Sequence, residues 1–239
     1  PGVGRVELGL NGTRWVTEGT RQIDYYITAG DCAQIMARYA DATGHAPLLP
    51  EWAAGFWQCK LRYRTQEELL SVAREYRRRG LPLSVIVVDF FHWSRLGDWD
   101  WDPECWPDPA GMIRELESMG IKLMVSIWPA VNPNSRNAAE LAAKGLLVGT
   151  DRGIPVLFPF VDVHDPGRVF VYYYDATHPE AREFIWQQVR EHYHRLGVKL
   201  FWLDACEPEI YPMDFDNLRY HAGPGLAAAG LYPLRHAQA

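Results

Sequence analysis

Apolar positions along residues 53–204 follow two alternating patterns. Short, nearly continuous apolar runs occur at 53–59, 83–90, 121–128 and 198–204. Between them, apolar residues recur every three to four positions over 65–80, 108–120, 135–145 and 177–197. Continuous runs are typical of strands covered on both faces, and the three-to-four spacing is typical of helices. Strands that alternate with helices form parallel sheets, so the pattern predicts an α/β fold.

Local signals mark where the helices begin. Thr65 with Glu68 and Thr177 with Glu180 each have the spacing of a capping box. Asp108 is placed as an N-cap, with Pro109 at the first helical position. We therefore expect helices to start at these three points.

The first 45 residues have a different pattern. GRVELGL, TRWVTEG and QIDYYITAG are strand-like, Asn11-Gly12 is a hairpin signal, and 31–44 is helical. Two prolines in HAPLLPEW then indicate a boundary near residue 46. We expect residues 1–45 to be the end of an N-terminal β domain with its linker, and 46–239 to be a second domain.

The interval between the third and fourth predicted strands is too long for a single helix. Its excess, near 149–176, contains TDRGIPVLFPFVDV and RVFVYYYD and predicts a β-rich insertion. Glycine-rich phosphate loops are missing from the sequence, which favours a (β/α) barrel over a dinucleotide-binding fold. A (β/α)8 TIM barrel needs eight strands, and four are predicted. We therefore expect the first half of such a barrel, in a fragment of a longer protein.

Composition and charge argue against several classes of protein. The net charge of −6 has its signs mixed along the chain, so no basic patch suggests nucleic acid. Without an apolar run of about 18 residues, no transmembrane helix is predicted. The four cysteines form no Cys-x-x-Cys pair, so we expect free thiols, which favour the cytoplasm without assigning a compartment. Because the chain starts at Pro1, we expect its true N-terminus to be absent.

Ten Trp and twelve Tyr are many for 239 residues. Such rings are often core residues, but several of these lie in loop-like segments such as FFHWSRLGDWDWDPECW. Exposed aromatic faces stack on weakly polar ligands, and the low basic content argues for sugars over nucleobases. We expect some of these rings to bind a ligand.

Polar and aromatic residues follow the ends of the predicted strands. These are Gln58 and Lys60, then Asp89, then Trp128, then Asp204 with Glu207 in FWLDACEPEI. Barrel active sites lie at the carboxyl ends of strands, so Asp89 and Asp204 predict one shared pocket, beside the aromatic residues Phe90, Trp93, Trp128 and Trp202. The alternative is that each acid only caps the loop that follows it.

Carboxylates among aromatic rings suit glycoside chemistry, in which one acid attacks or stabilises the anomeric carbon and another donates a proton. A metal site is the competing hypothesis, for which His92 near Asp89 is the one tempting pair. We expect no metal and no cofactor, since no His-x-His or His-Glu-x-x-His occurs. Gly-x-Ser-x-Gly is also missing, and acidic neighbours blunt the thiol of Cys206.

Several segments together resemble glycoside hydrolase family 31, the family of retaining α-glucosidases and α-xylosidases. They are GFWQCKLRYRTQEELLSVAREYRRRGLPLSVIVVDFFHW, KLMVSIWPAVNPNS, YYYDATHPEAREFIW and LFWLDACEPE. The resemblance implies an N-terminal β-sandwich, whose last strands would be residues 1–30. It also implies a (β/α)8 barrel with an insertion after strand three.

By this resemblance Asp204 matches the catalytic nucleophile, which forms a covalent glycosyl-enzyme intermediate. Asp89 matches the acid that binds sugar hydroxyls, and Trp128 an aromatic residue of the same subsite. The family's general acid/base lies on a later strand and has no counterpart here, so we expect this chain alone to be inactive. Phe90 and Trp202 are further substrate-binding candidates. Glu207 is expected to order the loop, and Glu209 to face solvent.

The nucleophile motif departs from the α-glucosidase pattern Trp-x-Asp-Met-Asn-Glu, because Ala205 and Cys206 replace Met and Asn. The motif is closer to the bacterial α-xylosidase-like branch, so an α-xyloside is preferred to an α-glucoside as substrate. Transglycosylation, a non-catalytic carbohydrate-binding protein and a metal-dependent barrel hydrolase stay open as alternatives. The expected partner is an oligosaccharide or other α-glycoside, without nucleic acid or membrane, and a homo-oligomer also stays open.

Overall fold

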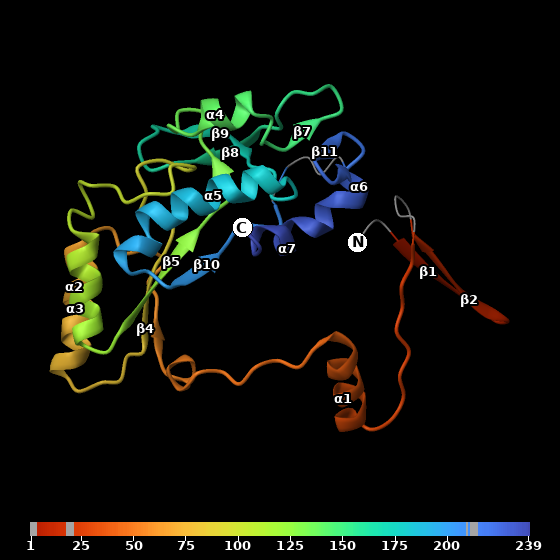
Figure 1. Cartoon of the computed structure of the whole chain (residues 1–239), viewed down its shortest axis with the longest axis horizontal. Helices are drawn as coiled ribbons and strands as arrows, with labels where there is room; N and C mark the ends of the chain where they lie inside the picture. Colours follow the sequence, from red (N-terminus) through yellow and green to blue (C-terminus); the bar gives the residue numbers. More distant parts are fainter. Residues whose placement is uncertain (1–3, 18–21, 209, 211–214) are drawn as a thin grey trace.

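The computed structural model describes residues 4–17, 22–208, 210 and 215–239. Figure 1 shows a hairpin and one helix standing apart from a larger α/β body. The hairpin pairs β1 (Gly4–Gly9) with β2 (Gly12–Thr17) and turns at Leu10 and Asn11, one residue before the Asn11-Gly12 turn predicted from the sequence. Helix α1 (Cys32–Thr43) follows. The prediction of a strand within QIDYYITAG is wrong. Residues 22–30 adopt no regular structure and pair with no described strand. Strand-forming residue types alone are therefore not enough to form a strand without a partner.

The body is built on a parallel sheet of four strands in the order β10-β5-β4-β3. These strands are β3 (Trp57–Gln58), β4 (Val85–Val88), β5 (Lys122–Ile127) and β10 (Leu200–Leu203). The helices between them are α2 (Gln66–Arg78), α3 (Pro109–Ser118), α4 (Ala138–Ala143) and α5 (Pro179–His192), and a 3-10 turn, Glu51–Ala54, precedes β3. The predicted α/β alternation is confirmed. The sheet is open, because β3 and β10 each pair with only one described neighbour.

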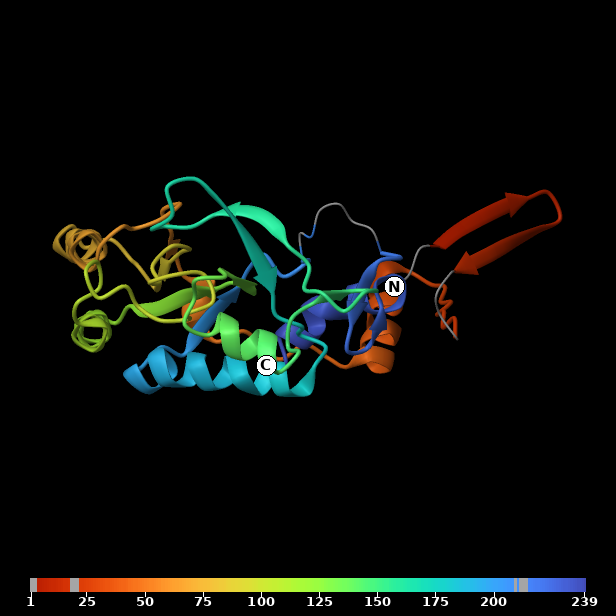
Figure 2. The same cartoon turned by 90° about the horizontal axis from the view of Figure 1, so that it is seen from above.

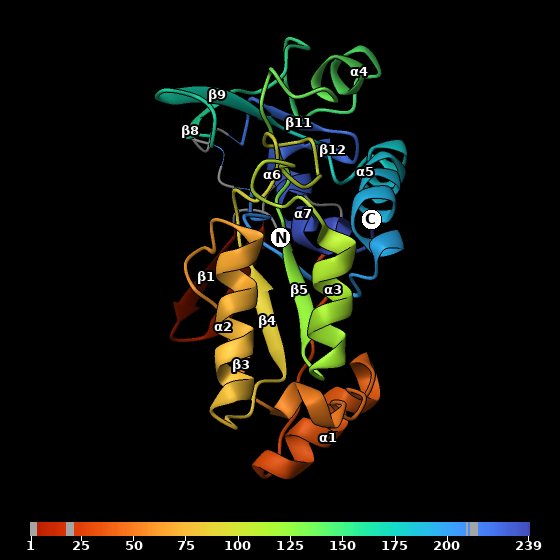
Figure 3. The same ribbon diagram turned by 90° about the vertical axis from the view of Figure 1, so that its left-hand side faces the viewer.

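The two faces of the sheet have different partners. Ile86, Val88, Val125 and Ile127 share the main core with apolar residues of the helices. Figure 3 shows α2 and α3 side by side against β4 and β5. Val85, Val87 and Met124 project from the opposite face, where Trp52, Trp57 and Leu200 cover them. Each fully buried side chain of this size contributes roughly 1.5–3 kcal/mol, so the helical side supplies most of the stability.

Helix starts agree with the sequence in two of three cases. Thr65 Oγ1 accepts a hydrogen bond from the Glu68 amide, and Asp108 Oδ1 accepts one from the Gly111 amide. The N-cap predicted at Thr177 is wrong. Its hydroxyl donates to the buried carboxylate of Asp175 at 2.7 Å, and the ring of His178 caps α5 instead. A nearby buried acid therefore overrides the local capping signal.

An antiparallel layer follows β5, and two of its strands lie within residues 149–176, where the sequence predicts a β-rich insertion. Strand β6 (Ala130–Val131) pairs with β9 (Arg168–Tyr173), which pairs with β8 (Phe158–Val161). A second small sheet joins β7 (Gly149–Thr150), β11 (Leu218–Tyr220) and β12 (Gly223–Pro224). In Figure 1 the arrow of β5 points toward β8 and β9, so this layer lies beyond the carboxyl end of the parallel sheet.

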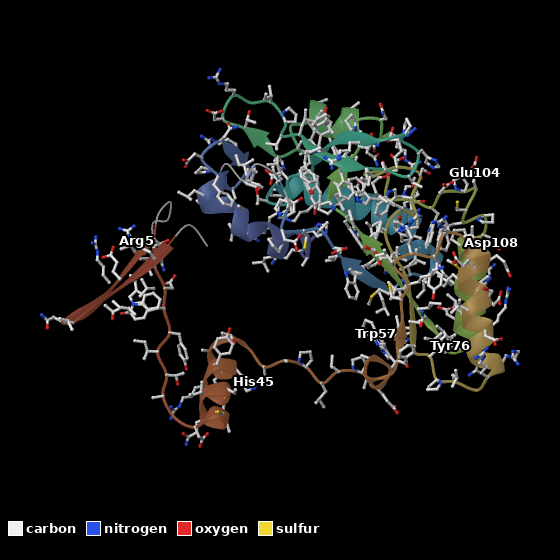
Figure 4. The ribbon with its side chains drawn as sticks, turned by 180° about the vertical axis from the view of Figure 1, so that it is seen from behind. Arg5, His45, Trp57, Tyr76, Glu104 and Asp108 are labelled. Atoms are coloured by element: carbon white, nitrogen blue, oxygen red, sulfur yellow. The ribbon has the colours of Figure 1, made fainter. Side chains whose placement is uncertain are left out.

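The remaining elements are short. They are the 3-10 turns His194–Leu196 and Ala229–Leu231 and the helices α6 (Gly225–Ala228) and α7 (Tyr232–His236). None of the described helices has both the length and the apolar character needed to cross a membrane. Figure 2 shows the hairpin extending away from the body at one end. In Figure 4, Arg5 and His45 accordingly lie far from Trp57 and Tyr76 of the body.

Tryptophans of the loop between β4 and α3 do not form the exposed platforms expected from the sequence. Trp93, Trp99, Trp101 and Trp106 are all buried. Two of them donate hydrogen bonds into the body, Trp99 to the carbonyl oxygen of Trp128 at 2.9 Å and Trp101 to that of His192 at 3.0 Å. The loop is long enough to pack on itself, so these rings form core and leave ligand binding to others.

Candidate active site

Three strand ends bring the predicted carboxylates to one edge of the sheet. Asp89 directly follows β4, Trp128 follows β5 and Asp204 follows β10, and these strands are parallel neighbours. The amide N–H of Asp204 donates to the carbonyl oxygen of Ile127 at 3.1 Å. This bond continues the β10–β5 pairing by one residue and holds Asp204 beside Trp128.

A pocket of about 170 Å³ opens at this edge. Its wall combines residues of the strand ends with residues of the insertion: Trp128, Ala130, Phe160, Tyr173, Asp204, Ala205 and Glu207. The structure thus brings together Asp204, Trp128 and Glu207, all of which the sequence singles out. Phe160 and Tyr173 are not anticipated from the sequence, because only the pairing of β6, β9 and β8 carries them to the pocket.

Aromatic rings surround the indole of Trp128. Its centroid lies 5.3 Å from that of Phe90, 5.6 Å from Phe160 and 6.0 Å from Trp93. The indole Nε1 of Trp128 is buried and has no hydrogen-bond partner among the described residues. The pocket is therefore bordered by the aromatic surface of Trp128, while its indole N–H lies buried away from the pocket.

Neither Asp89 nor Phe90 is among the residues that line this pocket, but the Asp89 carboxyl lies within electrostatic reach of Asp204. Burial raises the pKa of the Asp89 carboxyl, and the negative charge of Asp204 raises it further. The Phe90 amide donates to Asp89 Oδ1 at 2.8 Å, and this hydrogen bond lowers the same pKa. The two carboxyl groups are therefore electrostatically coupled across the ends of β4 and β10.

The end of β3 differs from the sequence-based expectation. Gln58 faces α2, where its Oε1 accepts a hydrogen bond from the Tyr76 hydroxyl at 2.8 Å, and Lys60 pairs with Glu68. Cys59, between them, is the residue that reaches the site, with its Sγ 3.6 Å from Asp89 Oδ2. Alternation along a strand explains this, because neighbours of an inward residue point outward.

The remaining candidates differ in where they lie. Trp202 is 50% exposed on β10, two residues before Asp204, and it is not part of the pocket wall. Glu207 is exposed and lies on that wall. Glu209 lies outside the described residues. Burial, followed by the charges of Glu207 and Asp204, raises the pKa of the Cys206 thiol, as the sequence predicts.

The backbone turns sharply after both acids. Phe91, two residues after Asp89, has φ of 62°, and Ala205, directly after Asp204, has φ of 53°. Residues other than glycine seldom adopt this left-handed conformation, and such strain clusters at functional sites. The turns let each carboxylate stay at its strand end while the chain leaves in another direction.

The insertion is tied to the strand-end loops by the buried carboxylate of Asp162. It accepts hydrogen bonds from the Leu96 amide at 2.9 Å and from Asn132 Nδ2 at 2.8 Å. The indole of Trp93 lies 3.4 Å from its other oxygen. Because Asp162 directly follows β8, these bonds hold Phe160 of that strand over Trp128.

His92 is not placed as a metal ligand. Its Nδ1 lies 2.9 Å from the Asp89 carbonyl oxygen and its Nε2 lies 2.9 Å from the Tyr193 hydroxyl, so both ring nitrogens are engaged. Burial lowers the pKa of His92 to about 4. Within residues 4–17, 22–208, 210 and 215–239, no three His, Cys, Asp or Glu side chains cluster as a metal site would require.

Comparisons with known proteins give a consistent result. The family description "Glycosyl hydrolases family 31 TIM-barrel domain" matches residues 46–239. An uncharacterized family 31 glucosidase, ORF2, of Pseudescherichia vulneris is 52% identical over the whole chain, which covers 44% of that protein. Alpha-xylosidase A of Aspergillus niger is 34% identical over the whole chain, which covers 34% of it.

Among solved structures, a GH31 alpha-xylosidase from a soil metagenome, complexed with xylose, is 54% identical, with a TM-score of 0.80. The similarity covers 88% of this chain and 30% of that one. The chain spans less than half the length of these relatives. The chain belongs to glycoside hydrolase family 31, and its residues 46–239 belong to that family's TIM-barrel domain.

Proposed function

We propose that the protein containing this chain is a retaining α-glycosidase that removes terminal α-linked xylosyl or glucosyl residues, with Asp204 as its nucleophile. The observation that carries the proposal is the position of Asp204, which ends a parallel strand and lies on the wall of a pocket lined by Trp128 and Phe160. A protein that only bound sugars would need the aromatic rings and Asp89, but it would not need this carboxylate.

In the proposed reaction the Asp204 carboxylate attacks the anomeric carbon of the substrate sugar. The glycosidic C–O bond breaks as the new C–O bond forms, and the leaving oxygen takes a proton from a general acid. Water then attacks the same carbon, gives up a proton, and releases Asp204. Two displacements at one carbon restore its configuration. None of the residues of this chain is assigned as the general acid.

Substrate binding falls to the groups around Asp204. The Asp89 carboxylate accepts hydrogen bonds from sugar hydroxyls, and the aromatic faces, including that of Trp128, pack on the sugar ring. Burial, and after it the charge of Asp204, raises the pKa of Asp89, whereas hydrogen bonds donated to Asp89 lower it and favour the ionised acceptor. Phe90 supports this subsite by packing on Trp128. Trp202 contributes at its rim.

We prefer xylosyl to glucosyl transfer. Ala205 and Cys206 stand where the α-glucosidase motif has Met and Asn. The A. niger relative and the soil-metagenome relative are both named alpha-xylosidases, and the latter was solved with xylose. Residues 1–45 are proposed to end a separate N-terminal β domain, for which the β1–β2 hairpin standing apart is the supporting observation.

The test is to assay the full-length protein on aryl α-xylosides and aryl α-glucosides and to follow the released sugar by NMR. We expect the α-anomer to appear first and the xyloside to be the better substrate. Initial release of the β-anomer would contradict the retaining mechanism. Binding of xylose without turnover would instead favour the non-catalytic carbohydrate-binding protein, and sugar transfer to added acceptors would favour the transglycosylase.

A further inference from the structure

The thiol of Cys59 faces two possible acceptors at the end of β3. Its Sγ lies 3.6 Å from Asp89 Oδ2 and 3.3 Å from the carbonyl oxygen of Lys60. The other oxygen of Asp89 already accepts the Phe90 amide. Each oxygen of the Asp89 carboxylate therefore has one donor, and Cys59 is the donor from outside its own loop.

Cys59 carries a single proton, so the charge on Asp89 decides where that proton points. An ionised carboxylate is a stronger acceptor than a neutral carbonyl group, and hydrogen bonds to charged groups are about twice as strong. The thiol therefore donates to Asp89 when Asp89 is ionised, and to the Lys60 carbonyl when Asp89 is protonated. A donor that pairs with only one form of an acid stabilises that form.

The thiol itself stays protonated. Burial, together with the neighbouring Asp89 carboxylate, raises the pKa of Cys59 to about 11. At neutral pH it is thus a hydrogen-bond donor rather than a thiolate nucleophile or metal ligand. A protonated thiol is a weak nucleophile, so the contacts of Cys59 favour orientation of Asp89 as its action.

We propose that Cys59 is a positioning residue, whose thiol holds the Asp89 carboxylate in the orientation that receives sugar hydroxyls. The assignment rests on the proposed function for the identity of the ligand, but the Cys59–Asp89 contact is independent of it. Titratable groups act on Asp89 from two sides, Cys59 from the end of β3 and Asp204 after β10. Strand β5 lies between β4 and β10, and the residue that follows it, Trp128, is uncharged.

The experiment compares Cys59→Ala and Cys59→Ser in the full-length protein. Cys32→Ala, which changes an exposed cysteine of α1, is the matched control. We expect Cys59→Ala to raise KM for an aryl α-xyloside roughly 3- to 10-fold, the effect of one lost hydrogen bond, with kcat changed less than about twofold. The acid limb of kcat/KM should move to higher pH. Cys59→Ser keeps a donor and should restore both values.

A second measurement does not depend on turnover. The carboxyl 13C shift of Asp89, assigned with Asp89→Asn, is followed against pH in each variant. We expect the apparent pKa of Asp89 to be higher in Cys59→Ala than in the native protein and in Cys59→Ser. Equal values in all three proteins would overturn the proposal, as would a Ser variant that behaves like the Ala variant. If the native protein lacks glycosidase activity, the proposed function fails while this titration still decides the role of Cys59.

Discussion

Asp204 and Ile127 are joined through their backbones, amide to carbonyl at 3.1 Å, one residue beyond the last pair of the β10–β5 ladder. The position of the Asp204 main chain is thus set by the sheet and does not depend on the Asp204 side chain. Side-chain substitutions at Asp204 should therefore leave the pocket in place, which makes its chemistry testable without loss of the fold.

Asp204→Ala in the full-length protein should lower turnover of aryl α-glycosides by about 10⁴-fold or more, because no covalent intermediate can form. Xylose binding, measured by calorimetry, should stay within a few-fold of the native value. Asp151→Ala is the matched control, since Asp151 is an exposed acid in the turn after β7. Near-native turnover of Asp204→Ala on both xyloside and glucoside would refute the assignment.

Asp89 should destabilise the native protein at neutral pH. Its folded pKa is raised, chiefly by burial, so folding favours the protonated form. The resulting loss of stability is absent well below the ordinary carboxyl pKa of about 4 and grows as pH rises through the folded pKa. Asp89→Asn should accordingly raise Tm at pH 7 by roughly 1–3 °C, and this gain should vanish toward pH 3.

The same Asp89→Asn variant should bind xylose more weakly, because an amide is a poorer acceptor than a carboxylate. Thermal scans at pH 3, 5 and 7, paired with binding at pH 7, check both effects. A variant that is less stable than the native protein at pH 7 would show that burial does not oppose ionisation of Asp89.

Removing the Asp162 carboxylate should loosen the insertion. Asp162→Ala leaves the buried donors of Leu96 and Asn132 unsatisfied, so the free energy of unfolding should fall by about 2–4 kcal/mol. Phe160 would lose its fixed position over Trp128, and KM should rise more than kcat falls. Denaturant unfolding and steady-state kinetics measure the two effects. Asp165→Ala, which removes a single bond to Asn132, should be milder.

Chelators should leave turnover unchanged. The one histidine close to Asp89, His92, has both ring nitrogens within 2.9 Å of protein oxygens. Dialysis against EDTA followed by assay with and without divalent ions tests this. Activity that disappears on dialysis and returns with one metal would favour the metal-dependent hydrolase.

The order of elements in the body follows from local patterns, so the sequence predicts it well. Buried strands and amphipathic helices are each encoded over about ten residues, and the strand ends at Asp89, Trp128 and Asp204 follow directly. The roles proposed for these residues stay predictions. Helix caps are less certain from sequence, since Asp175 draws the Thr177 hydroxyl away from α5.

Features that depend on pairing between distant segments are not predictable in the same way. Phe160 and Tyr173 reach the pocket because β9 pairs with both β6 and β8. The contact of Cys59 with Asp89 is not predictable for a different reason. Strand β3 has only two residues, too few for the sequence to show which side chains point toward the site. The strand expected within 22–30 fails because no described strand pairs with it.

The pocket wall has two structurally separate origins. Asp204 directly follows a strand of the parallel sheet, whereas Phe160 and Tyr173 come from the antiparallel layer, whose described strands pair with no strand of the parallel sheet. Substitutions in that layer can reshape the cavity without disturbing the ladder that carries Asp204, the proposed nucleophile. Under the proposed function, sugar preference and bond cleavage can therefore evolve separately. Substitutions in the antiparallel layer would change which sugar fits, while the parallel sheet keeps Asp204 in place.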